Sequence, residues 1–381
     1  MKKMIYILNH YSSKSTEHFF HVVNLLDEIA SNGVEIVLII EKSDSIPKIN
    51  NSNITVVCQK ETKKIQRSIE LFKLLKKFTK EGFNKIFIRI SVSSTLIAIL
   101  ASKLEKAEVF YWQSGTTYEI DKMNSGNKLS WFLKKYLPFK LLTNNIDYFV
   151  TGPESMANYY SKVVGIKKQK IKILYNDIDI KRFNSTTTKE KEELRRSMDI
   201  PIDQKIILIV HRLSPVRKTN YYLPYIIDKG IFKKNNAKIL VIGDGPEKNE
   251  LLKNIKEEDK EEFIEFLGSK QNSDIEKYYK IADVFLNPSY TEGFPRVIIE
   301  AMATGLPIVS TDAGGTKDLF GKKQLPYIVF KDSRNDLKDK LNIMLNEKID
   351  YTELKNENLE RVKRFSTKKV SEMYIKEIFY E

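Results

Sequence analysis

Short apolar runs alternate along the chain with longer segments in which apolar residues recur every three or four positions. In the first half, apolar runs stand at 4–8, 35–40, 54–58, 85–90, 108–112 and 148–151, and helical spacing at 16–31, 62–79 and 94–104. The second half repeats the alternation, with runs at 205–210, 238–242, 264–267, 284–287 and 308–310. Continuous apolar strands separated by helices are typical of parallel sheets that are covered on both faces. The pattern therefore predicts an α/β protein.

Length and cysteine content indicate the number of domains and the cellular compartment. The chain has 381 residues, enough for two domains, and its one cysteine, Cys58, allows no intrachain disulfide. A reducing compartment is therefore expected. No apolar run approaches the roughly 20 residues of a membrane-spanning helix. These features predict a cytoplasmic protein.

The formal net charge of +14 and the pI of about 9.3 favour an anionic partner: a nucleic acid, an acidic membrane face or a phosphorylated substrate. A lysine-rich composition without a special partner is the alternative. The basic residues form no module with interleaved aromatics, so no nucleic-acid partner is expected. Within 131–142, Trp131 and Phe132 stand beside Lys134 and Lys135, a mixture that can lie on an anionic membrane surface. The alternative is a helix that covers the sheet and is broken at Pro138.

One stretch, 284–310, combines a strand, a polar loop, a helix and a second strand. Glu292 lies in the loop and Glu300 in the helix, and the helix start between them can bind phosphate through its free N–H groups and its dipole. Hydroxyl acceptors on either side of an anion site match the order of ribose, diphosphate and sugar in a nucleoside diphosphate sugar. The alternative is a buried Glu300 paired to a lysine and a solvated Glu292.

The segment from Glu292 to Val309 contains the run Glu-Gly-Phe-Pro, a second Glu eight positions after the first, and the run Gly-Leu-Pro-Ile-Val. This segment resembles the signature of retaining glycosyltransferases of family 4 (glycosyl transferases group 1). The resemblance implies the GT-B fold, with two Rossmann-like, doubly wound parallel-sheet domains facing a cleft. We expect an acceptor-binding domain at 1–175 and a nucleotide-sugar-binding domain at 176–362. A C-terminal helix at 363–381 is expected to cross back to the first domain.

The resemblance also assigns site residues. Glu292 is expected to contact the transferred sugar and Glu300 the ribose, and the remaining donor-binding residues are Gly243, Gly293, Phe294 and Pro295. An Arg and a Lys of the family neutralise the leaving diphosphate. Arg212 matches the Arg; both Arg217 and Lys218 could align with the Lys, and we choose Lys218. These two cations and Glu292 form the predicted catalytic set.

The first half matches the family only by pattern. Its first loop, 9–18, lacks the paired glycines of the family, and we take His10 and Ser13 as candidates for contacts there. After the strand at 108–112, Gln113 stands near the position where relatives often carry a histidine, and Gly115 either lines the cleft or serves the turn. His18 and His21 have the spacing of a metal pair, but a solvated or packed pair is the commoner explanation.

The resemblance implies a hexosyltransferase-type enzyme that retains anomeric configuration and needs neither metal nor cofactor. It would move a sugar from a nucleoside diphosphate sugar to a glycan or lipid-linked acceptor in surface polysaccharide or glycoconjugate biosynthesis. Such a cytoplasmic protein could be peripheral on the inner face of the cell membrane. Two alternatives stay open: a nucleotide-sugar epimerase on the same fold, and a basic nucleic-acid- or surface-binding protein. The residues do not specify the sugar, the nucleotide or the acceptor.

Overall fold

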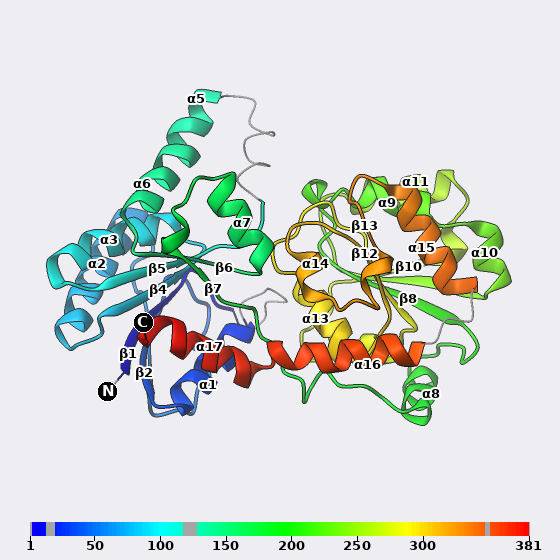
Figure 1. The fold of residues 1–381 in the computed structure, drawn as a ribbon, viewed down its shortest axis with the longest axis horizontal. Helices are drawn as coiled ribbons and strands as arrows, with labels where there is room; N and C mark the ends of the chain where they lie inside the picture. The colour runs from blue at the N-terminus through cyan, green and yellow to red at the C-terminus, as the bar shows by residue number, and fades with distance from the viewer. Residues whose placement is uncertain (1, 13–19, 117–127, 347–350, 381) are drawn as a thin grey trace. The chain divides into compact units, whose positions relative to one another are not determined.

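The computed structural model describes residues 2–12, 20–116, 128–346 and 351–380 (Figure 1). The chain divides into two compact units. Unit 1 comprises Met1–Asp177 and Thr367–Glu381, and unit 2 comprises Ile178–Ser366. Each unit is built on a parallel sheet, so the prediction of a two-domain α/β fold is confirmed.

Unit 1 holds a seven-stranded parallel sheet within its described residues, in the order β3-β2-β1-β4-β5-β6-β7. The strands are β1 Lys2–Leu8, β2 Val34–Ile40, β3 Ile54–Cys58, β4 Lys85–Arg89, β5 Glu108–Trp112, β6 Tyr148–Thr151 and β7 Ile171–Ile173. The helices are α1 Phe20–Ser31, α2 Lys64–Lys80, α3 Val92–Glu105, α5 Lys128–Trp131, α6 Leu137–Asn145, α7 Glu154–Lys162 and α17 Thr367–Phe379. Side chains of α2, α3, α6 and α7 form the core on one face of this sheet. On the other face, Tyr374 of α17 lies against Phe87 of β4.

Unit 2 holds a six-stranded parallel sheet within its described residues, in the order β10-β9-β8-β11-β12-β13. The strands are β8 Lys205–Val210, β9 Ala237–Ile242, β10 Ile264–Gly268, β11 Val284–Asn287, β12 Ile308–Thr311 and β13 Ile328–Val329. The helices are α8 Thr188–Ser197, α9 Thr219–Ile226, α10 Lys229–Lys234, α11 Lys248–Glu257, α12 Ile275–Ile281, α13 Arg296–Ala303, α14 Thr316–Leu319, α15 Arg334–Asn346 and α16 Tyr351–Val362. Because the strands are parallel, their carboxyl ends meet at one edge, where open α/β sheets bind ligands.

The segment around Pro138 differs from the broken helix that was considered. α5 continues through a π-helical segment, η1 Phe132–Tyr136, directly into α6, and Pro138 lies in the first turn of α6. A proline ring clashes with the carbonyl one turn back in a regular helix. The wider turn that precedes Pro138 relieves this clash, so the helix passes through the proline. In Figure 1 this helical arm projects from the sheet of unit 1.

In the described parts of the chain, no helix is both long enough and apolar enough to cross a membrane.

Candidate functional site

The two glutamates of the signature lie on one strand–helix–strand unit at the carboxyl edge of the unit 2 sheet. β11 leads into the loop that carries Glu292, and α13 follows with Glu300. Gly305 follows the helix with φ +75°, a left-handed conformation that is common where helices end. Gly314, at φ +57°, lies so close that a Cβ there would be 1.8 Å from the Glu292 carbonyl oxygen. The loop after β12 therefore supports the Glu292 loop through direct backbone contact.

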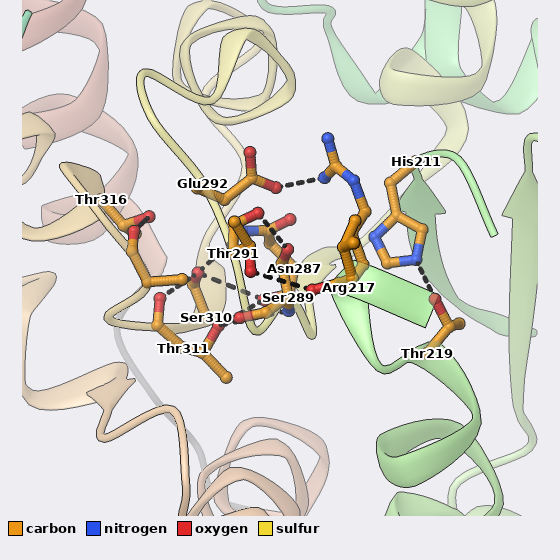
Figure 2. Close-up of polar contacts among 12 residues, drawn as sticks. His211, Arg217, Thr219, Asn287, Ser289, Thr291, Glu292, Ser310, Thr311 and Thr316 are labelled. Atoms are coloured by element: carbon orange, nitrogen blue, oxygen red, sulfur yellow. Dashed lines mark hydrogen bonds and ion pairs between the residues drawn. The ribbon is translucent and has the colours of Figure 1, made fainter. Parts of the chain in front are cut away.

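A buried set of hydroxyl and amide groups holds the Glu292 loop (Figure 2). The Ser289 N–H donates to Thr311 Oγ1 at 3.2 Å, and Asn287 Nδ2 donates to Ser310 Oγ at 3.1 Å. Thr291 Oγ1 donates to the Val216 carbonyl at 2.9 Å, which ties this loop to the one after β8. These residues were missed from the sequence, where the only signal is an accumulation of Ser, Thr and Asn at two strand ends. They fix the backbone on which Glu292 stands.

Glu292 is buried and ion-paired to Arg217 (Figure 2). Their side chains are 6% and 21% exposed, and Arg217 Nη1 donates to Glu292 Oε1. Lys218, the predicted catalytic lysine, instead has Nζ 3.3 Å from the centre of the Tyr290 ring. Lys218 has φ +53°, so the chain turns sharply after Arg217 and the two cations take different directions. The structure thus brings Arg217, rather than Lys218, to Glu292.

Arg212 and Gly243 come from the neighbouring loops after β8 and β9. Arg212 is exposed and has no hydrogen bond, ion pair or ring contact with the described residues. Gly243 has φ +137°, and a Cβ there would be 2.0 Å from the carbonyl oxygen of His211. Only glycine allows these two loops to lie this close. The free guanidinium of Arg212 is available to an anion.

His211 is a buried residue of this site that sequence reasoning missed. Its Nε2 is 3.0 Å from Thr219 Oγ1, and burial, followed by the charge of Arg217, lowers its pKa to about 3. The imidazole is therefore neutral at pH 7. It stands beside Arg217 without adding a charge to the site.

Among the residues that the structure describes, Glu300 contacts a tyrosine and no lysine. The Tyr279 hydroxyl donates to Glu300 Oε2 at 2.8 Å. This hydrogen bond stands where the alternative interpretation expected an ion pair with a lysine. Between the two acids, Phe294 is buried edge-on against Phe365, and Pro295 is the residue that precedes α13. Gly293 accepts a hydrogen bond at its carbonyl from the Gly315 N–H at 3.0 Å. The two carboxylates and the helix start between them therefore lie on one rigid unit.

The predicted residues of unit 1 lie at the ends of β1 and β5. Gln113 Oε1 accepts a hydrogen bond from the Tyr111 hydroxyl at 2.8 Å. Gly115 has φ +103°, and its carbonyl accepts from Tyr160, so it serves the turn. His10 follows β1 and is half-buried, whereas Ser13 lies outside the described residues.

The suggested metal pair falls partly outside the structure, because His18 is not among the described residues. In the ranges that are described, no group of three or more His, Cys, Asp and Glu side chains could hold a metal ion.

Comparison with known proteins places this site in a family. Residues 190–361 match the family model of glycosyl transferases group 1. The chain is similar to the putative teichuronic acid biosynthesis glycosyltransferase TuaC of Bacillus subtilis, with 34% identity over 39% of this chain and 34% of that protein. It is also similar to an N-acetylgalactosaminyltransferase of Campylobacter jejuni that acts on a diphospho-undecaprenol-linked sugar, with 31% identity over 58% of this chain and 57% of that protein. The matches thus span less than two thirds of either relative.

A solved structure extends the likeness to the whole chain. The crystal structure of Anabaena Alr3699/HepE in complex with UDP and glucose matches with a TM-score of 0.75 and 15% identity, and it covers 99% of each chain. At this identity the likeness concerns the fold. Residues 190–361, which carry all the candidate residues of unit 2, belong to the family of glycosyl transferases group 1, and the chain has the GT-B fold.

Proposed function

We propose that this protein is a retaining, hexosyltransferase-type glycosyltransferase that uses a nucleoside diphosphate sugar as donor and a glycan or lipid-linked sugar as acceptor. The observation that carries the proposal is the arrangement of Glu292, the α13 start and Glu300 on one rigid unit inside the family-matched region. Donor binding is supported by the solved neighbour, which binds UDP and glucose. A role in surface polysaccharide or glycoconjugate biosynthesis is supported by the two relatives.

In this proposal each part of the donor has its own contact. Glu300 accepts hydrogen bonds from the ribose hydroxyls, and Gly293, Phe294 and Pro295 place the α13 start against the diphosphate. Glu292 accepts from the sugar hydroxyls. Gly243 allows the loop after β9 to approach the loop after β8, from which the cations of the site come.

The transfer step needs charge stabilisation at the diphosphate. The bond between C1 of the sugar and the outer phosphate oxygen breaks, and the acceptor oxygen bonds to C1 on the same face. The leaving phosphate oxygen takes the acceptor proton. Arg212, which has no partner among the described residues, and Arg217 stabilise the departing charge in place of a metal ion. We assign Arg217 ahead of Lys218 because it is the cation that contacts Glu292.

Thermal stabilisation by nucleoside diphosphate sugars, in EDTA, tests the donor assignment. A ligand that binds only the folded state raises the melting temperature by an amount that grows with the ratio of its concentration to its dissociation constant. We expect one sugar nucleotide to stabilise the protein and Glu300→Ala to abolish the shift. A shift that persists in Glu300→Ala would remove that residue from the site. Consumption of the donor without an acceptor would favour the epimerase alternative.

The arm formed by α5, η1 and α6 supports a second part of the proposal, binding to an anionic membrane surface. The segment 128–146 contains Lys128, Lys134, Lys135 and Lys140 and no acidic residue. Leu129, Leu133, Leu137 and Leu141 are 67%, 52%, 39% and 48% exposed. Phe132 is also exposed and Trp131 is half-buried beside them.

The π turn aligns this apolar stripe. Residues four apart in an α-helix drift by about 40° around the axis at each step, because a turn holds 3.6 residues. The i→i+5 turn of η1 holds more residues and reduces the drift between Leu133 and Leu137. Apolar side chains along one line, bordered by lysines, suit the headgroup region of an anionic bilayer. We propose that the protein is peripheral on the cytoplasmic face of the cell membrane, where a lipid-linked acceptor would be available.

Co-sedimentation with vesicles tests this surface. We expect binding to vesicles that contain phosphatidylglycerol, weaker binding at high salt, and little binding to pure phosphatidylcholine. Leu133→Ser combined with Leu137→Ser should reduce binding. A control pair, Ile46→Ser with Val163→Ser, removes apolar side chains outside the arm that are even more exposed, 69% and 59%, and should not reduce binding. Equal effects of the two pairs would contradict the assignment.

A further inference from the structure

Tyr279 of α12 is buried in unit 2, and its ring is held from two sides. The Phe285 ring of β11 is 5.5 Å away, and the Phe183 ring stands edge-on at 5.8 Å, between ring centres. A buried aromatic ring fixed in this way leaves its hydroxyl little freedom. The hydroxyl is the only polar group of the side chain, and it is directed at Glu300 of α13.

The contact divides the roles of the two Glu300 oxygens. Oε2 accepts from the Tyr279 hydroxyl at 2.8 Å, whereas Oε1 has no hydrogen-bond or ion-pair partner among the described residues. Burial, and next the charge of Glu300, raise the pKa of Tyr279, so the hydroxyl remains a donor at neutral pH. A half-buried carboxylate with one anchored and one free oxygen presents a single oriented acceptor.

We infer that Tyr279 is a positioning residue which fixes Glu300 so that its free oxygen accepts a hydrogen bond from a ribose hydroxyl, and that this pair selects ribonucleotides over deoxyribonucleotides. The inference rests on the proposed function, because it takes the nucleoside diphosphate as the ligand of Glu300. A site built to bond a hydroxyl rejects the analogue that lacks it, because a buried polar group is then left unpaired. Tyr279 is therefore a determinant of donor specificity from an element outside the signature.

Calorimetric titration with UDP, GDP and their 2′-deoxy counterparts tests this inference. We expect Tyr279→Phe to weaken the binding of the preferred ribonucleotide by about 10-fold, because a hydrogen bond to a charged group is lost. Binding of the deoxynucleotide should change by less than about 2-fold, since its contact to Glu300 is already impaired. The ratio of ribo- to deoxynucleotide affinity should thus fall. Added to Glu300→Ala, Tyr279→Phe should have no further effect.

A matched control is available in the same unit. Tyr222 is equally buried, but its hydroxyl donates to the Lys331 carbonyl. Tyr222→Phe should leave the affinity ratio unchanged.

Three outcomes would contradict the account, each at a different level. If Tyr279→Phe weakens both nucleotides equally, its role is structural and the inference fails. If the ratio stays at its original value, Tyr279 does not orient Glu300. If the unaltered protein binds neither UDP nor GDP, the proposed function itself is at fault.

Discussion

The buried ion pair between Arg217 and Glu292 makes a quantitative prediction. Arg217→Ala removes one partner and leaves a carboxylate that is only 6% exposed without its cation. Breaking a buried pair in this way costs about 3–5 kcal/mol. Because the Arg217 side chain is 21% exposed, solvent screens the pair, and we expect a smaller loss of about 2–3 kcal/mol in the free energy of unfolding of unit 2.

A second substitution separates the charge effect from lost packing. In the double variant Arg217→Ala with Glu292→Gln, neither position carries a charge. The free energy of unfolding should therefore return to within about 1 kcal/mol of that of the original protein. Lys218→Ala removes the neighbouring cation, whose contact with the Tyr290 ring is worth about 0.5–1 kcal/mol.

The assay must report on unit 2. Both tryptophans, Trp112 and Trp131, lie in unit 1, so tryptophan fluorescence is unsuitable. Hydrogen exchange of α13 amides in increasing urea measures the opening of the relevant region. A loss below about 0.5 kcal/mol in Arg217→Ala, or no recovery in the double variant, would refute the reasoning.

Three further predictions concern unit 2. Gly314→Ala should destabilise unit 2 by at least about 2 kcal/mol and abolish donor binding, because its Cβ would clash with the Glu292 carbonyl. As a control, calorimetry should show a far smaller loss of stability for Gly165→Ala, where φ is also positive but no atom lies near the added Cβ. The pKa of His211 is lowered in the folded state, so unit 2 should lose up to about 2 kcal/mol between pH 6.5 and 5; urea titrations should show a flatter profile for His211→Gln, and an unchanged profile would contradict this. Thr187→Ala breaks the capping box of α8, and urea denaturation should show a loss of about 1 kcal/mol with donor affinity unaltered.

The sequence predicted the strands best where apolar runs are bounded by polar turns. β5, β6, β8 and β11 begin and end at the predicted residues. β7 and β13 were missed, since strands of three and two residues at the sheet edge show no periodicity. The passage of the helix through Pro138 could not be foreseen, because it depends on a π turn that has no signature in one sequence.

The site was predictable as far as the signature reaches. Glu292 and Glu300 were chosen as candidates from a local motif whose residues are close in the chain. The choice between Arg217 and Lys218 depended on the left-handed backbone at Lys218, which spacing does not reveal. Tyr279 could not be identified at all, because its contact with Glu300 depends on how α12 packs on α13.

Transfer of labelled sugar tests the central claim most directly. The protein is incubated in EDTA with the sugar nucleotide that stabilises it and with extracted lipid-linked glycans, and label is measured in the lipid fraction. The account predicts transfer with retained anomeric configuration, and at least about 100-fold slower transfer by a folded Arg212→Ala variant. Transfer that is undiminished in Arg212→Ala, or that inverts the anomeric centre, would contradict it.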